Sequence, residues 1–189
     1  LYSTNAVQWT TRVWWLLFVL GFRKVSILDG GLKEWRRVGY DIETGENSYN
    51  PANFETVSDN SVFVGKKRTQ HSINTKNCII LNALTSDLHR GESSRYGRPG
   101  RIPGSINIPF HELLEKNTHK LLNPTKALAI IKEKNINRET RVLNYCGGGI
   151  AATLNAFVLR QLGIENLEIY DNSMSEWAKD TSLPIETTE

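Results

Sequence analysis

Residues 141–153 read RVLNYCGGGIAAT. The apolar segment Arg141–Tyr145 predicts a strand, and a region of about Ile150–Leu162 predicts an amphipathic helix. Cys146 therefore lies on a glycine-rich loop that opens a helix. Backbone N–H groups converge on such a position, and the helix dipole favours a thiolate there. The stretch predicts a strand–loop–helix unit with chemistry at a sulfur nucleophile.

Composition and charge narrow the function classes. The chain has 189 residues, of which 39% are hydrophobic and 23% charged, as in globular domains. The net charge of +3 comes without a basic stripe, which argues against a nucleic-acid partner. The densest basic run, residues 66–68, predicts a solvated loop. The apolar run Trp14–Leu20 is far shorter than the roughly 20 residues that span a bilayer, so it predicts a buried helix and no membrane partner.

The chain has two cysteines, Cys78 and Cys146, and four histidines without metal-ligand spacing. We therefore expect no metal site and no other cofactor. Two distant cysteines in a domain of this size favour free thiols in a reducing compartment, so the expected location is cytoplasmic. Cys78 begins an apolar segment and is expected to be a small core side chain.

Two parts of the chain repeat each other. The first contains Leu17, Gly21, Asp29 and Glu34-Trp35, and the second contains Leu159, Gly163, Asp171 and Glu176-Trp177. Each pair is 142 positions apart, which indicates duplication. In the first copy Ser3 or Thr4 stands at the place of Cys146. The two glycines suit helix C-terminal positions.

Strands that alternate with helices predict an α/β fold with a parallel sheet flanked by helices on both faces. Further strands are expected at Lys24–Leu28, Val62–Val64, Cys78–Ala83 and Leu167–Tyr170. Only the second copy has upstream strands and helices. We therefore predict that residues 1–45 are the C-terminal part of a first, inactive domain, that residues 46–60 are a linker, and that residues 61–189 are the catalytic domain.

These motifs resemble the rhodanese-like sulfurtransferases. Residues 100–109, GRIPGSINIP, are similar to that family's Gly-His-Ile-Pro-Gly-Ala-x-Asn-x-Pro. Residues 170–177 and 28–35 are similar to its Asp-Gly-Ser-x-x-Glu-Trp segment. The resemblance covers nearly the whole chain and has the arrangement of two-domain members. It implies a rhodanese-like domain plus the remnant of a second one, with the missing N-terminal part of the first domain as a partner.

The resemblance also implies a reaction. A sulfane sulfur would move from a small anionic donor, 3-mercaptopyruvate or thiosulfate, through a persulfide on Cys146 to a thiol or cyanide acceptor. The candidate substrate-binding loop is Gly147, Gly148, Gly149, Ile150 and Ala151, because its glycines let successive N–H groups turn inward. Gly147 matches the family's mercaptopyruvate pattern Cys-Gly-x-Gly. Asn82-Ala83-Leu84 replaces the family's Asp-x-Arg, so its substrate arginines have no counterpart there.

An anionic donor needs a cation near the thiolate. Residues 90–101 contain four arginines in a stretch rich in glycine and serine. Arg95 and Arg98 are the preferred candidates for substrate binding, against the alternative of a solvated basic loop.

A cysteine on such a loop has two other possible functions. A cysteine-dependent phosphatase uses Cys-x5-Arg, whereas the sixth residue after Cys146 is Ala152, so the phosphate clamp is missing. A non-catalytic rhodanese-like binding or regulatory module remains the alternative, and the presence of Cys146 favours the enzyme.

Overall fold

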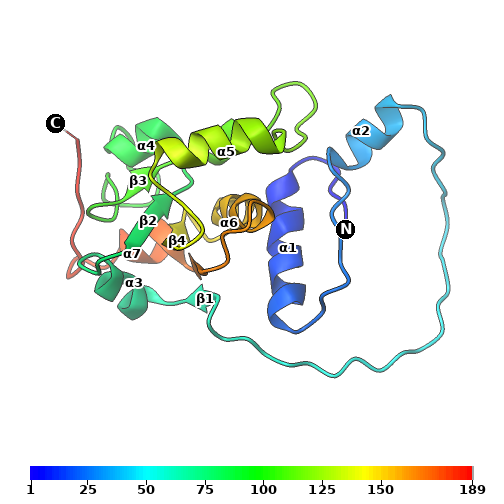
Figure 1. Cartoon of the computed structure of the whole chain (residues 1–189), viewed down its shortest axis with the longest axis horizontal. Coiled ribbons are helices and arrows are strands. Elements are labelled where there is room, and N and C mark those ends of the chain that lie inside the picture. Colours follow the sequence, from blue (N-terminus) through cyan, green and yellow to red (C-terminus); the bar gives the residue numbers. More distant parts are fainter. Residues whose placement is uncertain (189) are drawn as a thin grey trace.

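The computed structural model describes residues 1–188, whose centre is a five-stranded sheet (Figure 1). The strands are β1 (Phe63–Val64), β2 (Cys78–Asn82), β3 (Ile106–Asn107), β4 (Arg141–Tyr145) and β5 (Leu167–Tyr170). Their spatial order is β1-β5-β4-β2-β3, and every neighbouring pair is parallel. The predicted parallel α/β fold is confirmed. The carboxyl ends of the central strands, where open parallel sheets place their sites, include the end of β4 at Tyr145.

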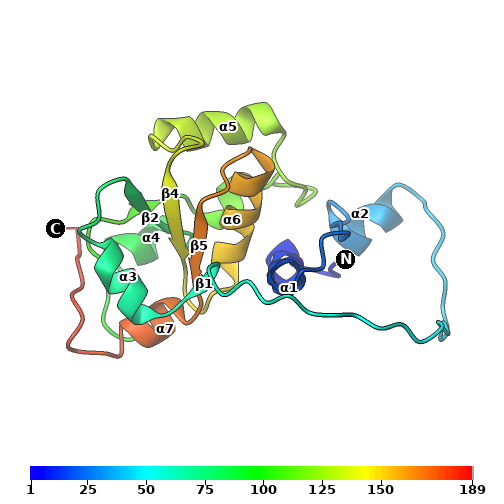
Figure 2. The same ribbon diagram turned by 60° about the horizontal axis from the view of Figure 1, so that its bottom comes forward.

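Helices cover both faces of the sheet (Figure 2). On one side α6 (Ala151–Gln161) packs on β4 and β5, and α1 (Val7–Val19) packs on α6. On the other side lie α3 (Lys66–Ser72) and α7 (Ser173–Trp177). The remaining helices are α2 (Gly31–Arg37), α4 (Ser86–Arg90), the 3₁₀ turn η1 (Phe110–Leu113) and α5 (Pro124–Glu133).

The basic run at residues 66–68 was predicted to be a solvated loop, and the structure corrects this. These residues begin α3, and two of them form ion pairs with carboxylates from other elements. Lys66 Nζ lies 2.7 Å from Asp180 Oδ2, and an Arg68 Nη lies 2.6 Å from Glu168 Oε1. Their partners are far along the chain, so local charge density gave no sign of them.

Helix α1 is held by α6. Trp15 is 1% exposed and donates its indole N–H to the Thr153 carbonyl at 3.0 Å. The Trp14 ring meets Phe157 edge to face at 5.0 Å. The apolar run at residues 14–20 is therefore a partly buried helix end, as predicted, although Leu16 is 39% exposed on the far side. No helix in residues 1–188 is long and apolar enough to cross a bilayer.

Both α1 and α6 end in the same way. Gly21 and Gly163 have φ of +91° and +83°, and they follow the last helical turn of α1 and α6. In each copy the N–H of the next residue donates back to a carbonyl five positions earlier, as in a Schellman motif. The glycine placement predicted from the repeat is confirmed.

Residues 24–28 were predicted to be a strand and are not one. Two of their hydrogen bonds join the chain start: Leu28 N–H donates to Leu1 O, and the Leu1 amino group donates to Ser26 O. A third comes from α1, where the Trp14 indole N–H donates to Val25 O at 3.1 Å. Two short segments without further neighbours are too few to build a sheet. After α2, residues 38–58 form an exposed, irregular segment that leads to β1 (Figure 1).

Candidate active site

Cys146 lies directly after β4 and is 2% exposed. Its N–H donates to Ser173 Oγ at 3.0 Å, and that hydroxyl donates to the Tyr170 carbonyl at 2.7 Å. Ser173 has a φ of 50°, a left-handed conformation that side chains adopt rarely. The strained serine at the start of α7 therefore fixes the cysteine backbone against the end of β5.

The carbonyls of the loop are turned outward by hydrogen bonds. Cys146 O accepts from Met174 N–H at 3.1 Å, and Gly147 O accepts from Ser175 N–H at 2.7 Å and from its hydroxyl at 2.6 Å. On the helix side, Gly149 O accepts from Arg12 at 3.4 Å and Ile150 O accepts from Thr153 N–H at 3.1 Å.

In a trans peptide the C=O and the next N–H point in opposite directions. The peptides that follow these four residues therefore aim their N–H groups to the other side of the loop. Within residues 1–188 three of these, the N–H groups of Gly147, Gly148 and Ile150, find no acceptor in the protein. Such a set of convergent donors at a helix start forms a nest for an anion.

The three glycines differ in what an added side chain would meet. Gly149 has a φ of +73°, and a Cβ there would lie 2.1 Å from the Asp171 carbonyl oxygen. A Cβ on Gly147 would lie 2.1 Å from the hydroxyl of Tyr96. A Cβ on Gly148 would meet nothing closer than Ser175 Oγ at 3.7 Å. Only Gly149 is required by the backbone, and Gly147 is required by a neighbouring side chain.

That neighbour, Tyr96, was missed in the sequence. It lies in the loop between α4 and β3, and its phenol covers the Cys146 loop. Burial, above all, raises the pKa of Tyr96, while Arg95 lowers it and Cys146 raises it further. The phenol therefore stays protonated and able to donate at neutral pH. Its chain distance from Cys146 hid this contact from sequence reasoning.

The two predicted arginines have different places. Arg98 donates to the carbonyls of Trp177, Ala178 and Asp180 at 3.3, 3.1 and 2.6 Å, so it ties the Tyr96 loop to the end of α7. Its Nε and one Nη are therefore bonded to the end of α7, and a role of Arg98 in substrate binding stays a prediction. Arg95 is exposed, and its guanidinium lies 5.6 Å from the centroid of the Tyr96 ring.

The motif at residues 100–109 supports the end of β4. The Tyr145 hydroxyl accepts from Ile102 N–H at 3.1 Å and from the Asn82 amide at 2.8 Å, and it shares a 2.8 Å hydrogen bond with Ser105. Complete burial, more than any other effect, raises the pKa of Tyr145 to about 12. This closed network fixes the residue before Cys146.

Arg12 of α1 also reaches the site. Its Nη1 lies 2.5 Å from Asp171 Oδ1 and 3.4 Å from Gly149 O, and its guanidinium lies 4.6 Å from the Phe63 ring centroid. Sequence reasoning placed no functional residue in the first copy. The one sign of Arg12 in the sequence was that it is the single charged residue of an otherwise uncharged, largely apolar helix.

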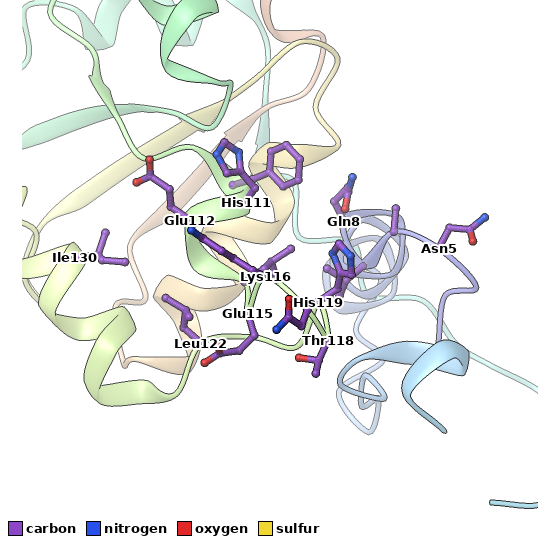
Figure 3. Close-up of a pocket in the computed structure, with 15 residues that line it drawn as sticks. Asn5, Gln8, His111, Glu112, Glu115, Lys116, Thr118, His119, Leu122 and Ile130 are labelled. Carbon is purple, nitrogen blue, oxygen red and sulfur yellow. The ribbon is translucent and has the colours of Figure 1, made fainter. Parts of the chain in front are cut away.

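A separate groove lies between the start of α1 and the segment 110–122 (Figure 3). Figure 3 shows Gln8 on one side and His111, Glu112 and Lys116 on the other. Cys146 and its loop do not line this groove. Within residues 1–188 no cluster of three or more His, Cys, Asp or Glu side chains could hold a metal ion.

This chain is similar to known proteins in sequence and in fold. Residues 73–180 match the model of the rhodanese-like domain. The chain belongs to the rhodanese-like family. The matched span of this rhodanese-like chain includes β2 to β5, the Tyr96 loop and the Cys146 loop.

Several curated relatives of this rhodanese-like chain are named as sulfurtransferases. The mouse 3-mercaptopyruvate sulfurtransferase is 31% identical over 181 residues, which are 93% of this chain and 60% of that protein. The Escherichia coli K12 protein of the same name is 29% identical over 184 residues, 93% of this chain and 63% of that one. This chain thus spans about 60% of the length of these relatives.

A solved structure shows the same fold. The anaerobic ergothioneine biosynthesis enzyme from Chlorobium limicola superposes with a TM-score of 0.84 over 95% of this chain and 45% of that one, at 19% identity. At that identity the likeness extends to the fold alone.

Proposed function

We propose that this chain carries the catalytic domain of a sulfurtransferase in which Cys146 transports a sulfane sulfur as a persulfide. The observation that carries the proposal is the set of outward-held carbonyls around Cys146, which leaves backbone donors for an anionic sulfur. The names of the curated relatives support the same reaction class.

The reaction divides into two displacements. The Cys146 thiolate attacks the transferable sulfur of the donor, so a new S–S bond forms. The donor's bond to that sulfur breaks, and the leaving group, pyruvate enolate or sulfite, keeps the electron pair. An acceptor thiolate or cyanide then attacks the outer sulfur of the persulfide and restores the Cys146 thiolate. The loop N–H groups stabilise the terminal sulfur anion between the two steps.

Tyr96 and Gly147 bear on the choice of donor. The Tyr96 hydroxyl occupies the space of a side chain at position 147, so a basic residue cannot follow Cys146 without displacing the phenol. A neutral phenol donates a hydrogen bond to a carboxylate or keto oxygen, and exposed Arg95 beside it supplies positive charge. These features favour 3-mercaptopyruvate over thiosulfate.

The test is a comparison of the two donors with cyanide as acceptor. We expect kcat/KM for 3-mercaptopyruvate to exceed that for thiosulfate by about tenfold or more, the range that one or two polar contacts give. Equal kcat/KM values for the two donors would contradict a role of Tyr96 in donor choice. Absence of turnover and of any persulfide with both donors would instead favour the alternative, a non-catalytic rhodanese-like module.

The proposal includes the domain division into residues 1–45, 46–60 and 61–189. It is supported by the outer face of α1, where Trp9, Val13 and Leu16 are 60%, 44% and 39% exposed. The α6 residues 142 positions later include Asn155 and Val158, which are 0% and 5% exposed. In the whole protein, elements related to residues 61–145 would cover α1 in the same way.

Gel filtration with hydrogen exchange tests this division on the chain as it is. We expect association through the uncovered face or rapid exchange in residues 1–45. A monomer in which residues 1–45 are fully protected would contradict the missing part of the first domain.

A reducing location such as the cytoplasm belongs to the same proposal, because the free thiol of Cys146 is its working form.

A further inference from the structure

We propose that Arg12 is a positioning residue for the Cys146 loop, an inference that rests on the proposed sulfur transfer at Cys146. The loop carbonyls Cys146 O and Gly147 O are held by α7, and Ile150 O is held within α6. Gly149 O is held by Arg12, a residue of α1. Within residues 1–188 this is the loop's one hydrogen bond from the first copy of the repeat.

The contact fixes one peptide plane. Because Gly149 O points at Arg12, the N–H of Ile150 points to the opposite side, where the persulfide would lie. Gly149 has no side chain and a φ of +73°, so its own backbone preferences restrain this peptide weakly. An external donor is therefore needed to keep the Ile150 N–H aligned.

Arg12 is itself held in place. Its guanidinium pairs with Asp171, lies over the Phe63 ring and is only 19% exposed as a side chain. The Asp171 backbone also touches Gly149, since a Cβ there would lie 2.1 Å from the Asp171 carbonyl. Arg12 thus joins the end of β5 and the loop into one rigid unit.

The other copy of the repeat shows that packing alone does not need an arginine. The residue 142 positions after Arg12 is Leu154, which is fully buried in a small apolar cluster with Val7 and Leu114. Val7 is 142 positions before Gly149. The contact of Leu154 with Val7 thus corresponds, in the repeat, to the contact of Arg12 with Gly149.

The decisive variant is Arg12→Leu, with Arg23→Leu as its control. Arg23 also stacks on an aromatic ring, 3.7 Å from the Phe18 centroid, but has no contact with the loop. We expect Arg12→Leu to lower kcat for persulfide formation by about 10- to 100-fold, the effect of misplacing one donor, with KM within about twofold. Arg23→Leu should keep both constants within about twofold.

Arg12→Lys separates positioning from stability. A lysine can keep the ion pair with Asp171, but its flexible Nζ lacks the fixed planar geometry that aims Arg12 Nη1 at both Asp171 and Gly149 O. We expect it to restore the melting temperature and leave kcat low. Recovery of both by lysine, or a wild-type kcat in Arg12→Leu, would overturn the proposal.

A readout without turnover keeps the two proposals apart. Backbone amide order parameters of Gly149 and Ile150 should fall in Arg12→Leu and stay unchanged in Arg23→Leu. Unchanged order parameters in both variants would refute the positioning role, whatever the activity. If wild-type protein forms no persulfide while the loop loosens as expected, the proposed function fails and the structural role of Arg12 stands.

Discussion

Helices α1 and α6 belong to two copies of one sequence pattern, and some contacts around them correspond. Met174 N–H donates to Cys146 O, and Leu32 N–H, 142 positions earlier, donates to Ser3 O. Ser173 and Gly31 share a positive φ. Thr11 and Thr153, again 142 positions apart, hydrogen bond to each other at 2.8 Å. Of the two predicted counterparts of Cys146, Ser3 therefore has the matching contact.

Around the two loops, the copies differ in a few side chains. One has a cysteine followed by three glycines, and the other has the sequence Ser3-Thr4-Asn5-Ala6 at that place. The Cys146 loop accepts a hydrogen bond from Arg12 at Gly149 O, whereas Leu154, the counterpart of Arg12, packs in an apolar cluster with Val7. Under the proposed function, one copy of the scaffold carries out sulfur transfer and the other serves packing. The difference would then depend on the nucleophile, the loop glycines and one cation.

The largest expected effect comes from making the catalytic copy resemble the silent one. Cys146→Ser should lower sulfur transfer by at least roughly 10³-fold, because a serine hydroxyl forms no persulfide. The melting temperature should be almost unchanged. The reverse change, Ser3→Cys, should create no second site, since its loop lacks the glycines. Turnover in Cys146→Ser would refute the assignment of the nucleophile.

The contact between the copies should matter next. Trp15→Ala removes a fully buried indole and its hydrogen bond to Thr153, so the free energy of unfolding should fall by about 3–5 kcal/mol. Trp9→Ala, on the exposed face of the same helix, should change it by about 0.5 kcal/mol or less. Urea titrations measure both. Equal losses would show that α1 is not anchored through Trp15.

The glycine loop gives a smaller and more local effect. Gly149→Ala places a Cβ at a positive φ against the Asp171 carbonyl, and should lower the free energy of unfolding by about 1–3 kcal/mol. Gly148→Ala meets only Ser175 Oγ at an ordinary contact distance of 3.7 Å and should cost less than about 1 kcal/mol. The silent loop has Ala6 and Val7 nearby, so it needs no such freedom. Similar losses for both variants would contradict this account of the loop.

Mild acid should have the smallest effect on stability, and this effect should arise in the second copy. All four histidines lie after residue 61, and burial, assisted by Arg101, lowers the pKa of His89 from 6.5 to about 4. Between pH 6.5 and about pH 4, His89 is protonated in the unfolded chain but stays neutral in the folded one. The free energy of unfolding therefore falls as the pH falls through this range. Thermal melting near pH 7 and near pH 5 should show the loss, and His89→Gln should flatten the slope. An unchanged slope would place the acid sensitivity elsewhere.

Sequence patterns predicted the parallel sheet, the helix ends at Gly21 and Gly163, and the position of Cys146 between β4 and α6. These features depend on local periodicity and on glycine chemistry. The contacts of Tyr96, Arg98 and Arg12 could not be predicted, because each joins elements between about 50 and 160 positions apart. The expected strand at residues 24–28 failed because a strand needs neighbours, and periodicity cannot supply them.

The central claim is that Cys146 holds a sulfane sulfur within a cradle of backbone donors. Intact-mass and peptide mapping after brief incubation with 3-mercaptopyruvate, without acceptor, tests it most directly. We predict an added mass of one sulfur atom on the peptide that contains Cys146, removed by cyanide and absent from the peptide that contains Cys78. An unmodified Cys146, or equal labelling of both cysteines, would contradict the claim.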